Sequence, residues 1–241
     1  MNKLILTFAG LLLLNCQLTD PTGVVESPQI IKLQVVDASL TVLNGVQTLD
    51  ADSNSACLIK VILQPKSDDA REITFTTTAG VFTNVGQAPT STSLSTFSIT
   101  PADREALVQL NALDVANKNV IVAATTGKVS SVLQFNFQTA YATDFQLSPL
   151  SATVKAADTV SIKITAFSSE GTMSEDQYVM VSTATDDDLL FDYTERIKLV
   201  NQKGSFKIIN TTKAAGKVTV KINVPTAADK TLAKNVVITY Q

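Results

Sequence analysis

From residue 30 to the end of the chain, apolar and polar residues alternate in short runs, and this alternation limits the fold more than any other feature. Between Ile31 and Val35, for example, Lys32 and Gln34 separate the apolar residues. Successive side chains of a β-strand point to opposite faces, so a period of two predicts strands with one buried face. The runs are rich in Val, Ile, Thr and Phe and are separated by polar turns, which is typical of an all-β protein.

The predicted strands are short and evenly spread along the chain. They fall at residues 31–35, 55–63, 72–78, 97–99, 106–110, 120–125, 133–137, 159–166, 178–183, 189–193, 196–200, 205–209, 217–224 and 236–240. Residues 101–105 are predicted to form one helical turn, because Thr100 suits the capping position and Pro101 the first helical position.

The strands fall into two sets that look like copies of each other. The matching pairs are Cys57 and Val160, Glu72 and Gln177, Asn111 and Asn210, and Phe135 and Val237, with offsets of 103, 105, 99 and 102 residues. Offsets this similar indicate a tandem repeat of about 100 residues. About seven short strands per repeat, without crossover helices, predict two tandem immunoglobulin-like β-sandwich domains.

Residues 72–82, which read Glu-Ile-Thr-Phe-Thr-Thr-Thr-Ala-Gly-Val-Phe, resemble the middle of bacterial Ig-like domains of the invasin and intimin type. Residues 106–137 are similar to the closing strands of those domains, and the resemblance extends over residues 30–241. The second copy departs further, since Thr185 stands where the first has Gly80. The resemblance implies a fold built for packing and turns, and it carries over no catalytic residue.

The first sixteen residues read as an export and anchoring signal. Lys3 supplies a positive charge, and residues 4–14 form an apolar run of eleven residues. As a helix this run would be only about 16 Å long, whereas a bilayer core is about 30 Å thick. It is therefore too short to span a membrane, which favours a cleaved signal peptide.

The sequence Leu13-Leu14-Asn15-Cys16 resembles the lipobox of bacterial lipoproteins. The resemblance implies a signal peptide over residues 1–15, lipidation of Cys16, and a lipidated tether over residues 16–29. Asn15 replaces the usual Gly, Ala or Ser, which leaves the efficiency of processing open. The alternative is an ordinary secreted protein in which Cys16 lies inside a longer signal.

Cleavage would leave 226 residues, which is enough for two domains, predicted at residues 30–140 and 141–241. Without Lys3 the chain has 18 basic and 22 acidic residues, and they are scattered. No basic stripe is present to neutralise phosphates, which excludes a nucleic-acid partner.

The only cysteine besides Cys16 is Cys57, and alternation places Cys57 on the apolar face of its strand, as a small core residue.

The composition excludes most catalytic chemistry. The chain has no histidine, so it has no Ser-His-Asp triad, no histidine metal site and no base to activate Cys57. Its nine glycines are dispersed and form neither a P-loop nor a dinucleotide fingerprint. The absence of tryptophan leaves polysaccharide binding unsupported. We therefore predict no enzymatic activity, no cofactor and no small-molecule substrate.

Acidic residues gather in the second repeat. They are Asp186, Asp187 and Asp188, together with Glu170, Glu175, Asp176 and Asp192. Carboxylates clustered on a loop are ligands for Ca²⁺, but the spacing matches no EF-hand. A solvated acidic turn is the favoured interpretation, so no metal site is assigned, and the sequence leaves open whether Asp186, Asp187 and Asp188 bind Ca²⁺. Two of these carboxylates could also serve as the catalytic pair of a glycosidase, but nothing in the sequence indicates the cleft that such an enzyme needs.

These features predict a non-enzymatic cell-envelope lipoprotein of a diderm bacterium, held at the outer membrane through lipid on Cys16 and acting as a protein-interaction or scaffold module. An accessory subunit of an envelope complex is the first hypothesis. The alternative is a surface-exposed adhesin or spacer that binds ligands on host or neighbouring cells. The sequence leaves open the membrane face, the protein partner and the oligomeric state.

Overall fold

The computed structural model describes residues 30–64, 72–169, 171–175, 177–185 and 188–241. These parts are all-β, which confirms the predicted fold class of tandem β-sandwiches. Within them no helix is long and apolar enough to cross a membrane. The predicted signal peptide, the tether and Cys16 lie outside the described residues.

The first sandwich is built from two five-stranded sheets. In sheet order these are β2-β1-β4-β8-β6 and β3-β10-β9-β5-β7, and every pair is antiparallel except β3 with β10. The strands are β1 Ile31–Val36, β2 Val42–Leu43, β3 Gln47–Ala51, β4 Ala56–Leu63, β5 Ile73–Thr77, β6 Val81–Thr83, β7 Thr96–Ile99, β8 Glu105–Asn111, β9 Asn117–Thr126 and β10 Val129–Thr139.

The second sandwich repeats this arrangement. Its sheets have the orders β11-β13-β17-β15 and β12-β19-β18-β14-β16, with β12 and β19 as the parallel pair. The strands are β11 Asp144–Ser148, β12 Ser151–Val154, β13 Thr159–Phe167, β14 Tyr178–Thr185, β15 Phe191–Tyr193, β16 Arg196–Lys198, β17 Lys203–Asn210, β18 Gly216–Ala227 and β19 Lys230–Tyr240.

Each core consists of the residues that alternation placed on the inner faces. In β13, Val160, Ile162, Ile164 and Ala166 are buried and the residues between them are exposed. The first core holds four fully buried phenylalanines, Phe75, Phe82, Phe135 and Phe137, whereas the second is mainly aliphatic. Burial of these apolar faces is the main favourable contribution to folding of both sandwiches.

Two details of the sequence interpretation are wrong. Residues 101–105 form no helical turn. Instead Asp103 and Arg104 have φ angles of 47° and 66°, and the Glu105 amide donates to the Ala102 carbonyl at 2.9 Å. Two residues with positive φ form a tight turn that the isolated antiparallel bridge between Ala102 and Glu105 closes, and this turn replaces the expected helical turn.

The second detail is the alignment of the two repeats at their last matched pair, Phe135 and Val237. Phe135 is fully buried in β10, whereas Val237 in β19 is only half-buried, and its neighbours Val236 and Ile238 are the core residues. The predicted pair is therefore one residue out of step. A shift of one residue moves a side chain to the opposite face of a strand.

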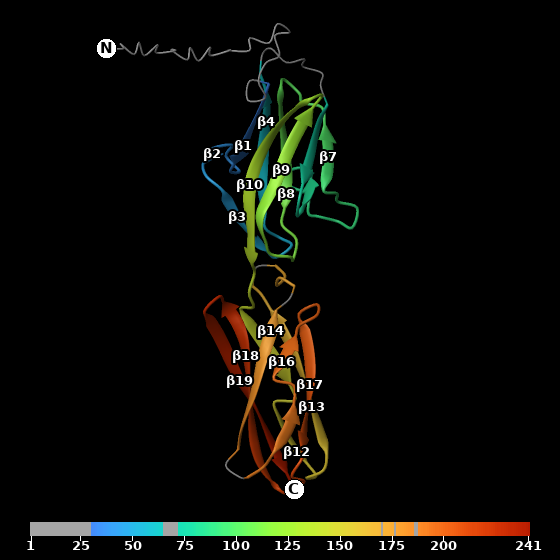
Figure 1. The fold of residues 1–241 in the computed structure, drawn as a ribbon, viewed down its shortest axis with the longest axis vertical. Helices are drawn as coiled ribbons and strands as arrows, with labels where there is room; N and C mark the ends of the chain where they lie inside the picture. Colours follow the sequence, from blue (N-terminus) through green and yellow to red (C-terminus); the bar gives the residue numbers. More distant parts are fainter. Residues whose placement is uncertain (1–29, 65–71, 170, 176, 186–187) are drawn as a thin grey trace, which may run out of the picture.

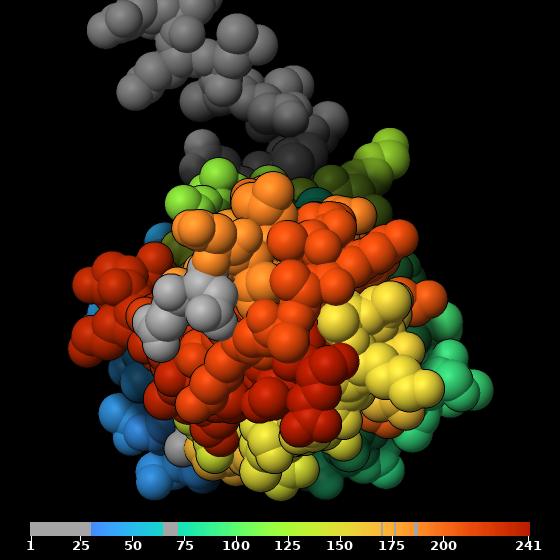
Figure 2. Space-filling view, turned by 90° about the horizontal axis from the view of Figure 1, so that it is seen from below, coloured from blue at the N-terminus to red at the C-terminus, as the bar shows by residue number. Residues whose placement is uncertain are grey.

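The two sandwiches are stacked along the long axis of the molecule, and the C-terminus lies at the end of the second that is farthest from the first (Figure 1). Viewed along this axis from the C-terminal end, the yellow, orange and red strands of the second sandwich stand in front of the blue and green first one (Figure 2).

Candidate functional site

The residues singled out in the sequence do not form a common site. Glu175 precedes β14 and Asp188 follows it, so they lie beyond opposite ends of a strand of eight residues, which spans about 26 Å. Asp186, Asp187, Glu170 and Asp176 lie outside the described residues. Among the residues that the structure does describe, no group of three or more His, Cys, Asp or Glu is placed to hold a metal ion.

Cys57 is a free, half-buried thiol that packs against the first core beside Leu110 of β8. Burial raises the pKa of the Cys57 thiol to about 12. Because the thiolate is the nucleophile, a thiol with this pKa is inert near neutral pH. The side chain therefore acts as a small core residue.

The most extensive polar site of the described molecule is the junction between the sandwiches. It is formed by the loop between β13 and β14, which contacts the first sandwich. The Ser174 hydroxyl donates to the Ala51 carbonyl at 2.7 Å and accepts from the Ala140 amide at 2.8 Å. Ser174 is only 4% exposed, so one hydroxyl joins β3 to the linker and to the second sandwich in a buried environment.

Further hydrogen bonds extend this contact along the loop. The amide and the hydroxyl of Thr172 both donate to the Asp52 carbonyl, at 2.9 and 2.8 Å. The Glu175 amide donates to the Asp114 carbonyl at 2.6 Å. The buried Gln177 side chain donates to the Ala140 carbonyl at 3.1 Å.

Gly171 and Asp52 explain why the two chain segments fit so closely. A Cβ atom on Gly171 would lie 2.9 Å from the Asp52 carbonyl oxygen, and φ of this glycine is +98°. The Asp52 carboxylate accepts the amides of Asn54 and Ser55 at 2.9 and 2.6 Å, which orders the turn that presents the Asp52 carbonyl. Only glycine combines this backbone conformation with this approach.

A groove with a volume of about 1260 Å³ lies beside the junction. Its walls come from β3, β9, β10 and the linker, and from loops of the second sandwich. Four side-chain amides line it, those of Asn117, Asn119, Asn136 and Gln138. Sequence analysis missed them, because each reads as an ordinary solvent-facing residue of an alternating strand.

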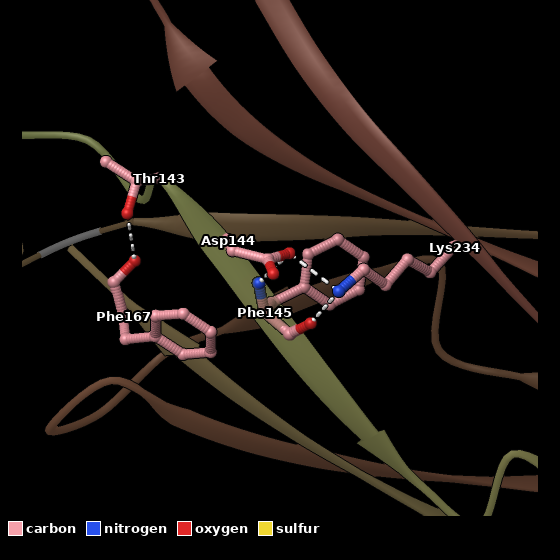
Figure 3. Close-up of polar contacts among 5 residues, drawn as sticks. All are labelled: Thr143, Asp144, Phe145, Phe167 and Lys234. Carbon is pink, nitrogen blue, oxygen red and sulfur yellow. Dashed lines mark hydrogen bonds and ion pairs between the residues drawn. The ribbon is translucent and has the colours of Figure 1, made fainter. Parts of the chain in front are cut away.

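A cluster of polar contacts fixes the first strand of the second sandwich next to the junction (Figure 3). The Lys234 ammonium forms an ion pair with Asp144 at 2.6 Å, donates to the Phe145 carbonyl and lies 4.9 Å from the centre of the Phe145 ring. The hydrogen bond from Lys234, together with that from the Phe145 amide, lowers the pKa of the Asp144 carboxyl. The cluster ties β11 to β19 across the two sheets.

The first sandwich also carries a hairpin that the second lacks. Asp37 accepts hydrogen bonds from the amides of Ser39 and Thr41 at 2.8 and 2.9 Å, and the chain turns back to add β2 at the edge of the sheet. Four large apolar side chains on this segment, between 38% and 51% exposed, are Leu40, Val42, Leu43 and Val46. Sequence analysis did not find this strand, since two residues cannot show a period.

No family model and no curated protein matches the chain. The solved structures with similar folds include bacterial Ig-like adhesin domains. The adhesin InvE of Yersinia pseudotuberculosis superposes with a TM-score of 0.53 at 9% identity, over 88% of this chain and 60% of that one. InvD of the same organism gives 0.36 at 13% identity, over 87% and 57%. The D0-D1 domain of intimin gives 0.29 at 15%, over 87% and 98%.

The chain thus spans three fifths of the length of InvE. At 9% identity the likeness shows the fold alone, which is a tandem Ig-like β-sandwich. Fold alone does not assign an activity, because activity depends on particular sites.

Proposed function

We propose that this protein is a non-enzymatic lipoprotein of the bacterial cell envelope that acts as a protein-interaction or scaffold module. Residues 1–15 are the signal peptide, lipid on Cys16 anchors the chain in the outer membrane, and residues 16–29 tether the two sandwiches, 30–140 and 141–241. Two acyl chains on one cysteine give stable anchoring. The first role is that of an accessory subunit in an envelope complex.

The observation that carries this proposal is the hydrogen-bonded junction. Ser174 and Thr172 join the second sandwich to the backbone of Ala51 and Asp52 in the first. Two sandwiches joined in this way extend as one unit from the anchored end, and the C-terminus lies at the far end (Figure 1). An extended unit tethered to lipid at one end carries its distal surface away from the membrane.

The alternative is a surface-exposed adhesin or spacer. It is favoured by the similarity of the fold to that of the adhesin InvE. Both roles use non-covalent contacts made by sheet edges and loops, and both are independent of catalysis.

The anchor is tested by metabolic labelling with an alkyne-bearing fatty acid. We expect label on the wild-type chain and none on Cys16→Ser, which should leave the outer-membrane fraction. Cys57→Ser is the matched control and should be labelled as the wild type is, because Cys57 is half-buried in the sandwich. Equal labelling of wild type and Cys16→Ser would contradict the proposal.

The two roles are separated by protease shaving of intact cells, with an epitope tag after the exposed residue Gln241. Loss of the tag on intact cells supports the adhesin or spacer. Protection on intact cells, with digestion after lysis, supports the accessory subunit, whose partners are then identified by crosslinking.

A further inference from the structure

The groove beside the junction has a floor made of outward-facing polar side chains. Asp50 comes from β3, Gln138 from β10 and Asn119 from β9, three neighbouring strands of one sheet. Asp50 and Gln138 already contact each other, since the Gln138 amide nitrogen donates to the Asp50 carboxylate at 2.7 Å. This bond fixes the orientation of both side chains on the floor of the groove.

A β-bulge shapes the centre of this floor. The register of β10 on β9 shifts between Phe135 and Phe137, which places one extra residue in β9. Asn119 lies in this bulge with φ of +62°. Its backbone amide, displaced from the ladder, donates to the Asn136 side-chain oxygen at 3.1 Å. Bulges of this kind redirect side chains and are frequent next to binding sites.

The bulge leaves an ordered set of donors and acceptors that face the groove. Asn119 uses its side-chain oxygen to accept from Gln134 at 2.8 Å, and Asn136 uses its oxygen for the Asn119 amide. Among the described residues, the side-chain nitrogens of Asn119 and Asn136 have no protein acceptor. Gln138 in the same way retains its side-chain oxygen. Each of these three side-chain amides is oriented by one hydrogen bond and keeps its other polar atom available. They can therefore hydrogen-bond to a ligand that is rich in hydroxyl groups.

The charge and size of the groove narrow the class of ligand. Lys118 is the only basic residue in its lining, and Asp50 and Asp52 are acidic, so an anionic ligand would find little stabilisation. The half-buried Tyr141 adds an aromatic side chain to a lining that is mostly polar but also includes Phe137 and four alanines. The volume of about 1260 Å³ exceeds the range of roughly 300–1000 Å³ that is usual for small-molecule pockets. A chain of several neutral rings fits these properties better than a small ion.

We propose that this groove binds a neutral glycan chain, with Asn119, Asn136 and Gln138 hydrogen-bonding to ring hydroxyls and Tyr141 packing against a sugar ring. Sugar hydroxyls donate and accept at once, which matches a floor that offers two amide nitrogens and one amide oxygen. The site goes beyond the protein-contact role proposed above and does not depend on the lipid anchor. The second sandwich has no equivalent, since the bulge in its β18–β19 pair lies between Pro225 and Ala227, in the hairpin end.

The test is calorimetric titration of the full chain, in detergent, with chitohexaose, maltohexaose and cellohexaose. We expect at least one of these probes to bind with a dissociation constant below about 1 mM, which is the weak end of specific recognition. Asn136→Ala and Asn119→Gly should each weaken that binding about five- to tenfold, the effect of one hydrogen bond. Glycine is chosen at 119 because it accepts the left-handed backbone.

Asn235→Ala is the matched control, because it removes an exposed amide from β19, outside the groove, and should bind as the wild type does. Gln138→Ala provides a second surface variant if either asparagine variant unfolds. The proposal is overturned if no probe binds at concentrations up to about 5 mM, well above the expected constant. It is equally overturned if the groove variants bind as tightly as the wild type, because the ligand then lies elsewhere.

Discussion

The two sandwiches have the same strand order, yet they differ in how the first strand crosses from one sheet to the other. In the second sandwich, two residues separate β11 from β12. In the first, ten residues separate β1 from β3, and they fold into the hairpin that carries β2. The shared order shows what the fold requires, and the added hairpin and the bulge at Asn119 show where the first copy has been specialised.

A second difference lies after the central strand of each copy. Gly80 follows β5 with φ of +77°, and a Cβ there would lie 2.6 Å from the Asn111 carbonyl oxygen. At the position matched by sequence, Thr185 ends β14 and its hydroxyl donates to the Lys217 carbonyl at 2.8 Å. The same place is a closely packed turn in one copy and a continuing strand in the other.

The largest expected effect is the loss of stability when a core side chain of one sandwich is truncated. Phe135→Ala removes a fully buried ring and should lower the free energy of unfolding by about 3–5 kcal/mol. Calorimetry should show the loss in the transition of the first sandwich, and Ile238→Ala should produce its main loss in that of the second. A loss below about 1 kcal/mol for Phe135→Ala would mean that this site tolerates truncation, which would contradict a tightly packed first core around Phe135.

A smaller effect is expected at the central turn. Gly80→Ala combines the left-handed backbone with a contact that the Asn111 carbonyl cannot relieve, and it should destabilise the first sandwich by about 2–4 kcal/mol. Gly127→Ala is the control, because Gly127 also has positive φ but has open space around its Cβ position, and it should cost only about 1 kcal/mol. Chemical denaturation of both variants would measure this difference, and equal losses would show that steric contact is irrelevant at Gly80.

The junction should respond more weakly. Ser174→Ala leaves the Ala51 carbonyl and the Ala140 amide buried without this hydroxyl, which should cost about 1–3 kcal/mol. The two calorimetric transitions should also move apart, because the sandwiches lose part of their coupling. The exposed Ser161→Ala on β13 is the control and should leave both transitions in place. Unchanged transitions in Ser174→Ala would show that the junction does not couple the sandwiches.

The smallest effect concerns acid stability of the second sandwich. The Lys234 hydrogen bond lowers the pKa of Asp144 from its usual 3.8, so the ionised carboxylate favours the folded state. This stabilisation is complete above the unfolded pKa and is lost as pH falls through the folded pKa. Asp144→Asn should therefore slightly lower the melting temperature near pH 7 and have a smaller effect at about pH 2. Melting curves over this range test the sign, and an equal decrease at both pH values would contradict it.

Alternation was sufficient to predict the long strands, since a period of two is clear along the nine residues of β13 and the twelve residues of β18. The edge strands β2, β3, β6, β11 and β12 were missed, because each is only two to five residues long and a period of two is hard to recognise over so few residues. The parallel pairing of β3 with β10 depends on residues some 90 positions apart, which no local pattern reveals. The local helical signal at residues 101–105 was overridden by a tight turn that the bridge between Ala102 and Glu105 closes.

The candidate sites were less predictable than the fold. Ser174 and Thr172 read as loop residues, and their role depends on carbonyls about 120 residues earlier in the chain. The amides at Asn119 and Asn136 gain significance only from the bulge that brings them together. The acidic residues near 186 looked clustered in sequence, but Glu175 and Asp188 lie beyond opposite ends of β14.

We expect the hydrogen bonds of the junction to hold the two sandwiches as one rigid unit. This expectation is tested most directly by the distance between spin labels at Thr96→Cys in β7 and Lys207→Cys in β17, both exposed positions, in a Cys16→Ser background. Cys57 remains unlabelled because burial raises the pKa of its thiol to about 12. We expect one narrow distribution of distances by electron–electron double resonance. A broad distribution in the chain with an intact Ser174 would show a flexible hinge in place of a rigid junction.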